Sequence, residues 1–521
     1  MVDTKKEQER DELHRAIWAI ADELRGAVDG WDFKNYVLGT MFYRYISENL
    51  CNYINSGEID AGNTEFDFAK MPDEDAEEAK EGLVEEKGFF ILPSELFCNV
   101  RDNAANDENL NETLERVFRH IEESAKGSEA ESDFAGLFDD YDVNSNKLGS
   151  TVAKRNEKLV KLLNGVGEMN LGDVKDHSID AFGDAYEYLM TMYASNAGKS
   201  GGEFFTPADV SELLTRLGTV GKTEINKVYD PACGSGSLLL KAEKILGKDA
   251  IRNGFYGQEI NITTYNLCRI NMFLHDVGFD KFDIACEDTL LSPQHWDDEP
   301  FELIVSNPPY SIKWAGDENP LLINDPRFAP AGVLAPKSKA DMAFIMHSLS
   351  WLASNGTAAI VCFPGIMYRG GAEQKIRKYL VDNNYVDCII QLPSNLFFGT
   401  SIATCIMVMK KNKTDNKTLF IDATSECVKV TNNNKLTPEN IERIVDVFAK
   451  REETEHFSHL ASYEEVSEND YNLSVSNYVE AEDTREKIDI VKLNAEIKEI
   501  VAREQVLRDE IDKIIAEIEV G

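Results

Sequence analysis

The spacing of apolar residues changes twice along the chain and divides it into three regions. In the first third, apolar residues recur with a helical period, as Leu13, Ile17 and Leu24 do. This period predicts helices over residues 9–28, 33–46, 156–163 and 180–193. Residues 1–170 are therefore predicted to form an α-helical N-terminal domain.

Beyond residues 197–202, short apolar runs alternate with amphipathic stretches such as 340–352 and 373–381. The predicted strands are 228–229, 255–258, 282–285, 303–305, 358–363, 386–391 and 403–409. Alternation of strand and helix predicts an α/β domain over residues 171–475, with a doubly wound, mostly parallel sheet of the Rossmann type. The last two strands are joined by a loop too short for a helical crossover, so we expect them to pair antiparallel.

The third region carries apolar residues in alternating steps of three and four, a heptad pattern that only Glu504 interrupts. These residues are Ile490, Leu493, Ile497, Ile500, Leu507, Ile511, Ile514 and Ile518. The narrow apolar seam and charged flanks predict a coiled-coil-like helix within residues 476–521. They favour a partner helix from another chain for subunit assembly, although a helix folded back on its own chain is the alternative.

Composition fits a folded protein of several domains. The 521 residues are 43% hydrophobic, with no run of eighteen apolar residues and a charged beginning, so we expect a cytoplasmic protein without a membrane segment. The nine cysteines include no Cys-x-x-Cys pair and the eight histidines no ligand set. The sequence therefore predicts neither a disulfide framework nor a metal site.

Charge restricts the function more than composition does. The formal net charge is −39, and residues 73–86 and 122–140 are strongly acidic, which we interpret as solvated helix faces and loops. Such a chain repels nucleic-acid phosphates on average. Either the substrate is not a nucleic acid, or another subunit supplies the basic surface.

One tetrapeptide, Asn307-Pro308-Pro309-Tyr310, follows the predicted strand 303–305 by a single residue. The Asn307 side-chain oxygen and the Pro308 carbonyl can both accept hydrogen bonds from one NH2 group, which frees its delocalised lone pair for attack. Pro308 and Pro309 fix the backbone, and Tyr310 can stack on the planar group being modified. The motif predicts methylation of an exocyclic or amide nitrogen; a simple Pro-Pro turn is the alternative.

A glycine-containing loop ends the first predicted strand and opens a helix. It contains Asp230, Gly234, Ser235, Gly236 and Ser237. The glycines allow a ligand to approach the backbone closely, and the helix N-terminus favours a carboxylate or phosphate. It is not a full dinucleotide fingerprint, because Leu239 stands where the third glycine would be.

Two acids follow at the ends of the next two predicted strands. Glu259 can accept both hydroxyls of a ribose, and Asp288 can accept the amino group of an adenine. Each acid taken alone more often caps a helix than contacts a ligand. Together with Asp230 and Asn307 they mark four consecutive strand ends, the edge at which open α/β sheets bind ligands.

The order and spacing of these motifs resemble S-adenosylmethionine-dependent amino-methyltransferases. The upstream segment Glu203, Phe204, Phe205, Thr206 and Pro207 resembles that family's N-terminal cofactor motif. The resemblance implies that Asp230 and the glycine loop hold the methionine moiety, Glu259 the ribose and Asp288 the adenine. Phe397 and Phe398 resemble the second wall of a target-base pocket that includes Tyr310; which ring stacks is open.

The resemblance extends to the helical region. Residues 17–26, 32–34, 45–47 and 147–149 look like the helical domain of the methylation (HsdM-like) subunits of type I restriction-modification systems. Glu287 before Asp288 and Cys233 in the loop depart from the usual pattern without removing a proposed contact. The resemblance implies methyl transfer from S-adenosylmethionine to N6 of adenine in duplex DNA.

The sequence lacks a basic region that could recognise a DNA target, and this absence points to partner subunits. Residues 411–521 are short and acidic and hold no basic target-recognition region. The resemblance implies a separate specificity subunit that binds two copies of this chain, and a restriction (motor nuclease) subunit. The alternatives are a protein glutamine N5-methyltransferase and a non-catalytic adenine-nucleotide-binding scaffold, and intact Asn307 and Tyr310 argue against the scaffold.

Overall fold

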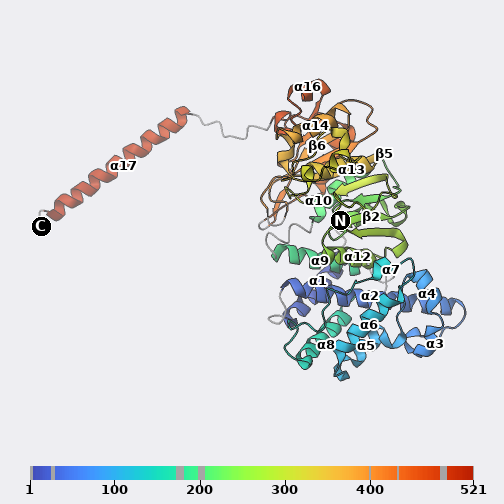
Figure 1. The fold of residues 1–521 in the computed structure, drawn as a ribbon. Coiled ribbons are helices and arrows are strands. Elements are labelled where there is room, and N and C mark those ends of the chain that lie inside the picture. Colours follow the sequence, from blue (N-terminus) through green and yellow to red (C-terminus); the bar gives the residue numbers. More distant parts are fainter. Residues whose placement is uncertain are drawn as a thin grey trace. The chain divides into compact units, whose positions relative to one another are not determined.

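The computed structural model describes residues 4–24, 30–171, 181–196, 206–397, 400–430, 433–480 and 490–519 (Figure 1). The contacts within the chain separate two units, Met1–Val479 and Glu480–Gly521. None of the described helices is both long and apolar enough to cross a bilayer.

The helices predicted for the N-terminal region are confirmed within the described residues. They are α1 (Thr4–Leu24), α2 (Gly30–Asp60), α8 (Val152–Glu168) and α9 (Ala181–Asn196). The sequence did not predict the shorter helices between α2 and α8, namely α3 (Asp73–Glu77), α4 (Lys80–Lys87), α5 (Phe97–Asn103), α6 (Leu110–Ser124) and α7 (Glu131–Phe134). Helix α6 carries glutamates and arginines on one face and buries Leu114, Val117 and Ile121 on the other. Its apolar face makes it part of the core of the helical region.

The sheet contains nine strands in the order β11-β8-β6-β7-β5-β4-β1-β2-β3. Their bounds are β1 (Val228–Asp230), β2 (Phe255–Glu259), β3 (Phe282–Cys286), β4 (Phe301–Ser306), β5 (Leu352–Cys362), β6 (Val386–Gln391), β7 (Cys405–Lys410), β8 (Thr418–Asp422) and β11 (Ser458–Ala461). Strands β5, β4, β1, β2 and β3 are mutually parallel. All seven predicted strands are present, and the doubly wound α/β fold is confirmed.

The last two predicted strands, β6 and β7, pair antiparallel, as their short connection predicts. Strand β7 lies between β5 and β6 and pairs antiparallel with both. The sequence did not predict β8, which pairs parallel with β6, or β11, which pairs antiparallel with β8. Strand β11 reads Ser-His-Leu-Ala, which has too little apolar character to signal a strand before its partner is known.

Alternating residues of β4 face two separate apolar cores. Leu303 and Val305 pack with helices α10 (Ala208–Thr219), α11 (Ser237–Leu246) and α12 (Ile262–Leu274). Ile304 packs with α13 (Asp341–Trp351) and α14 (Ala372–Asp382) on the other face. Helix α10 lies so close to the sheet that a Cβ on Gly218 would be 2.3 Å from Leu303 Cδ1. The helices on both faces therefore fix the plane of the strands that lead to the site.

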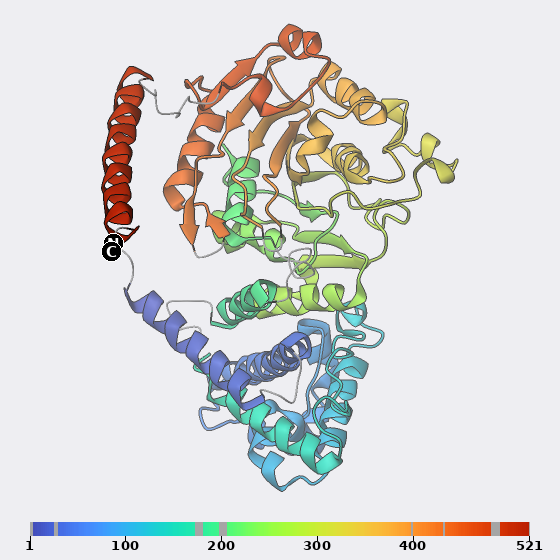
Figure 2. The same ribbon diagram turned by 90° about the vertical axis from the view of Figure 1, so that its left-hand side faces the viewer.

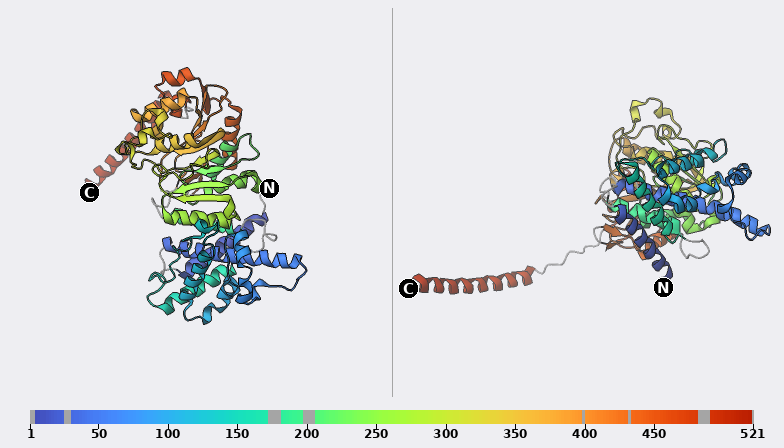
Figure 3. Two further views of the ribbon diagram at one scale, coloured as in Figure 1. Left: turned by 45° about the vertical axis from the view of Figure 1, so that its right-hand side comes forward. Right: turned by 90° about the horizontal axis from the view of Figure 1, so that it is seen from below.

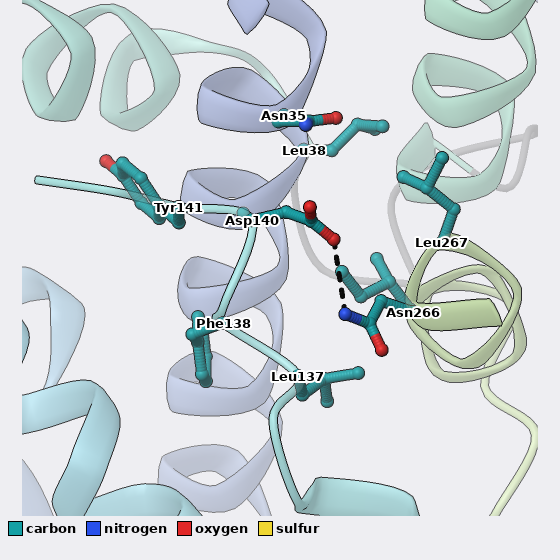
Figure 4. A pocket seen from close by; sticks show the side chains of 10 residues that line it. Asn35, Leu38, Leu137, Phe138, Asp140, Tyr141, Asn266 and Leu267 are labelled. Carbon is teal, nitrogen blue, oxygen red and sulfur yellow. Dashed lines mark hydrogen bonds between the residues drawn. The ribbon is translucent and has the colours of Figure 1, made fainter. Parts of the chain in front are cut away.

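Helix α12 joins the helical region to the sheet, and Figures 2 and 3 show α12 and α9 between them. The Arg269 guanidinium is 1% exposed and donates to Ser132 O at 2.7 Å and to Ala135 O at 3.0 Å. Asp140 accepts hydrogen bonds from Thr263 Oγ1 at 2.9 Å and from Asn266 Nδ2 at 3.2 Å, the contact drawn in Figure 4. The apolar core continues across this joint, since Phe273 of α12 contacts Phe42 and Phe134.

The second unit contains helix α17 (Ile490–Glu519), and none of its residues is buried. The helix spans the predicted heptad pattern, so the prediction of a helix there is confirmed.

Substitution of Arg269 by leucine tests the joint. The change removes the donor to Oδ1 of Asn266, which is buried, and to the partly buried carbonyls of Ser132 and Ala135, so it should lower the free energy of unfolding by about 2–4 kcal/mol. Urea unfolding would measure the loss, with the exposed Arg119→Leu as the control, which should change stability by no more than ~0.5 kcal/mol. Equal effects of the two substitutions would contradict the role of Arg269.

Candidate active site

The side chain of Asn307 is fixed from both ends at the end of β4. Its Nδ2 donates to Thr206 Oγ1 at 3.1 Å, and Tyr310 OH donates to its Oδ1 at 2.6 Å. Burial raises the pKa of Tyr310 well above its ordinary value, so the phenol keeps its proton. The amide oxygen of Asn307 therefore faces Tyr310, and its Nδ2 faces Thr206.

The backbone after the motif is anchored to α13. Ser311 adopts a left-handed conformation, with φ 52°, and its N–H donates to the Asp341 carboxylate at 3.0 and 3.2 Å. This carboxylate stands in the first turn of α13. The two prolines and this anchor hold Asn307 and Tyr310 in one geometry.

Asp230 connects the glycine loop to strand β4. It is 2% exposed, and its Oδ1 accepts hydrogen bonds from Ser306 Oγ at 2.6 Å and from Ala232 N at 2.9 Å. Burial raises its pKa to about 7. Ser306 directly precedes Asn307, so one carboxylate oxygen ties the end of β1 to the residue before the Asn-Pro-Pro-Tyr motif.

The glycine loop reaches α11 through two left-handed residues, Gly234 with φ 54° and Gly236 with φ 77°. A Cβ on Gly236 would lie 2.7 Å from Cys268 Sγ, so both conformation and space favour glycine. Gly236 is the N-cap residue of α11 and supplies no side-chain cap, which leaves the helix N-terminus open to an anionic group.

The two strand-end acids are not helix caps. Glu259 accepts hydrogen bonds from Gly234 N at 3.1 Å and Asn261 N at 2.9 Å, whereas the N-cap of α12 is Asn261. Burial raises the pKa of Glu259. Asp288 stabilises a turn rather than a helix, because its Oδ1 accepts from Leu290 N at 2.9 Å and Leu291 N at 3.2 Å.

The structure brings most of the predicted site residues to one sheet edge. Asp230, the glycine loop, Glu259 and Asp288 follow β1, β2 and β3, and Asn307 to Tyr310 follow β4. Glu203, Phe204, Phe205 and Phe398 lie outside the described residues, while Pro207 is the N-cap residue of α10. Phe397 is 3% exposed within the apolar core, so which of Phe397 and Phe398 stacks stays open.

Two features of this edge could not be found from the sequence. The Ser306 hydroxyl binds Asp230, and serine is too common for the sequence to single it out; Thr206 was predicted as part of the cofactor motif, but not as the partner of Asn307. In addition, His295 Nδ1 lies 3.3 Å from Asp298 Oδ2 and 3.8 Å from Asp283 Oδ2. This cluster has the composition of a metal site, but a hydrogen bond between His295 and Asp298 has the same geometry, so it assigns no ion.

A doubly wound sheet with an antiparallel strand beside β5, and an Asn-Pro-Pro-Tyr motif at the end of β4, define the class of amino-group methyltransferases. Residues 177–487 match the N-6 DNA methylase family model, and residues 13–166 match the HsdM N-terminal domain. The chain belongs to the N-6 DNA methylase family, as a type I restriction-modification methylase subunit.

The similarity to other methylase subunits extends over most or all of the chain. The chain is 50% identical to the type I restriction enzyme MpnII methylase subunit of Mycoplasma pneumoniae, across 100% of this chain and 98% of that protein. It is also similar to the crystal structure of a type I restriction-modification methyltransferase subunit from Streptococcus thermophilus. That match has 36% identity and a TM-score of 0.81, covering 90% of this chain and 100% of the other.

Asp230→Asn tests the raised pKa of Asp230. Its pKa is about 7 in the folded protein against 3.8 for the ordinary group, so the native state holds a proton that the unfolded chain releases between these values. The wild type should therefore lose stability relative to Asp230→Asn as the pH rises from about 5 to about 7, by up to a few kcal/mol. Urea unfolding across that range measures the difference, and parallel curves would contradict the assignment.

Proposed function

We propose that the carboxyl edge of β4, β1, β2 and β3 is the active centre in which this subunit binds S-adenosylmethionine and methylates N6 of adenine in duplex DNA. The observation that carries the proposal is the fixed Asn307 amide beside three acid-bearing strand ends. The adenine specificity rests on the N-6 DNA methylase family match, which also decides against a glutamine methyltransferase and a non-catalytic scaffold.

The residues present fit this cofactor. Asp230 and the open N-terminus of α11 suit the methionine ammonium and carboxylate, and Glu259 suits the ribose hydroxyls. Asp288 has one oxygen engaged by Leu290 and Leu291, and its other oxygen can accept the adenine amino group. When bound, the cofactor supplies an electrophilic methyl group on a sulfonium.

The target amine is activated by acceptors, not by a base. Asn307 Oδ1 and Pro308 O accept the two N6 hydrogens, so the nitrogen lone pair is withdrawn from the ring and directed at the methyl group. The Thr206 hydroxyl keeps Nδ2 of Asn307 turned away from the substrate. After transfer the N6 proton leaves to solvent, and Tyr310 covers the face of the flipped base.

Target recognition comes from other subunits. We propose a specificity subunit that binds two copies of this chain, together with a restriction subunit, and a cytoplasmic location in which chromosomal DNA is accessible. The net charge of −39 supports an external basic surface. The exposed seam of α17, which includes Ile497 and Ile511, supports docking through a helix of the partner.

Asn307→Ala tests the chemistry in the assembled complex. Loss of the amide acceptor should lower methyl transfer to DNA by roughly 10²-fold or more, with S-adenosylmethionine affinity unchanged. Transfer of a labelled methyl group measures activity, with and without the co-encoded specificity subunit, and Asn319→Ala on the exposed loop beyond the motif is the matched control. We expect activity only with the partner; labelled protein without labelled DNA would contradict the proposal.

The docking role of α17 is tested in the full chain by Ile497→Asp combined with Ile511→Asp. Charge on the seam should abolish assembly with the specificity subunit and spare cofactor binding, because a buried unpaired carboxylate is costly at a helix interface. Lys498→Asp combined with Lys513→Asp, off the seam, is the control. Truncation after Val479 should act like the seam variant, because Tyr478 stacks on Phe420 at 3.8 Å and belongs to the first unit. Intact complexes from the seam variant would refute docking through α17.

A further inference from the structure

A buried arginine lies behind the proposed adenine-binding turn. Arg327 stands in the long segment between Tyr310 and α13, and its side chain is 1% exposed. Its Nη1 donates to Thr289 O and its Nη2 to Leu290 O, each at 2.8 Å. These two carbonyls directly follow Asp288. One guanidinium therefore spans the two peptide groups that set the shape of the turn.

The guanidinium is itself held in one orientation. Asp325 accepts from its Nε at 3.0 Å and from its Nη2 at 2.8 Å, a two-point contact that a lysine could not make. The rings of Phe328 and Trp296 lie 4.7 and 5.5 Å from its central carbon. The planar group thus cannot rotate without losing several contacts at once.

A neutral histidine connects this arginine to β1. His347 Nδ1 lies 3.2 Å from Arg327 Nη1, and His347 Nε2 lies 2.8 Å from Tyr229 OH. Burial and the neighbouring Arg327 lower the pKa of His347 well below its ordinary value. The neutral ring accepts from Arg327 and donates to Tyr229, the residue before Asp230. The hydrogen bonds of Arg327 and His347 therefore connect the turn after Asp288 with Tyr229, the residue before Asp230, at the two ends of the proposed cofactor site.

The turn is also held from its other side. The amide of Gln258, which is fully buried, donates to Glu287 O at 3.1 Å and to Ser292 O at 2.9 Å. Thr289 Oγ1 donates to Pro231 O at 2.6 Å. The N–H groups of Leu290 and Leu291 are thereby fixed in direction, and they hold Oδ1 of Asp288. A shift of the carbonyls at 289 and 290 would rotate the same peptides and release the carboxylate.

We propose that Arg327 is a positioning residue for the methyltransfer reaction: by holding the carbonyls of Thr289 and Leu290, it aims the Asp288 carboxylate at the cofactor's adenine amino group. The inference rests on the proposed cofactor site. A buried cation is costly unless every donor is used, and well-packed apolar residues could fill the same volume. The N–H donors of Arg327 bind the two carbonyls of this turn, together with Asp325 and His347, which hold the guanidinium in place.

The test is a double-mutant cycle between Arg327→Lys and Asp288→Ala in the full chain. Calorimetry would measure the affinity for S-adenosylhomocysteine and for its analogue with hypoxanthine in place of adenine. Each single substitution should weaken S-adenosylhomocysteine binding by roughly tenfold, and the double variant should be no weaker than Asp288→Ala. Arg327→Lys should also reduce the preference for adenine over hypoxanthine, a change that a loss of general stability would not cause.

Arg377→Lys is the matched control. Arg377 is also 1% exposed and also donates to two carbonyls, those of Ile366 and Tyr471, at 2.7 and 2.8 Å. The Arg377→Lys variant should be less stable than the wild type but should keep its affinity for S-adenosylhomocysteine and its preference for adenine. If Arg327→Lys fails to fold, Asp325→Asn, which weakens the hold on the guanidinium, should lower the adenine preference in the same direction.

The outcomes separate the role of Arg327 from the cofactor site itself. Unchanged binding by Asp288→Ala would refute the proposed adenine contact. Weakened binding by Asp288→Ala together with an unaltered adenine preference in Arg327→Lys, or with additive losses in the double variant, would leave the cofactor site standing and overturn the role of Arg327.

Discussion

The parallel pairing of β1 between β4 and β2 is the constraint on which the rest of the structure depends. Tyr229 pairs with Ile304 on one side and with Tyr256 on the other, so the three strands end at the same edge of the sheet. The hydrogen bond from Ser306 to Asp230 fixes the alignment of β4 with β1 at that edge. A slip of one residue would turn the side chains of the strand to the opposite faces of the sheet and separate the glycine loop from the Asn-Pro-Pro-Tyr motif.

The site combines two kinds of rigidity. Asn307 is held by Thr206 and Tyr310, and the turn at Asp288 is held by backbone hydrogen bonds that buried Arg327 and Gln258 complete. Such preorganisation suits a reaction that relies on orientation and on hydrogen-bond acceptors rather than on a strong base. Under the proposed function, the net charge of −39 leaves the binding of duplex DNA to other subunits, so chemistry and recognition would be divided between chains.

Much of this arrangement could be predicted from the sequence because it is local. Strands β1 to β7 are marked by apolar runs, and the glycine loop and Asn-Pro-Pro-Tyr motif have fixed spacing. Consecutive parallel strands end at the same edge of the sheet. The fold class alone was therefore enough to predict that four residues lie together there, namely Asp230, Glu259, Asp288 and Asn307. The seam of α17 was visible for the same reason, because a heptad is a local pattern.

What could not be predicted depends on contacts between distant segments. Arg327 lies 37 residues beyond Leu290, in a segment without periodicity, and nothing in its neighbourhood marks it as buried. Thr206 and Asn307 are 101 residues apart, and the polar strand β11 exists only because β8 offers it a free edge. The register of such contacts is set by tertiary packing, which overrides local propensity.

Hydrogen exchange of the full chain with and without S-adenosylhomocysteine tests the central claim most directly, namely that one sheet edge holds the cofactor. The account predicts slower exchange at saturating ligand in the turns 232–237 and 287–292, with no change in α6 of the helical region. Protection confined to the helical region, or none in either turn, would contradict it.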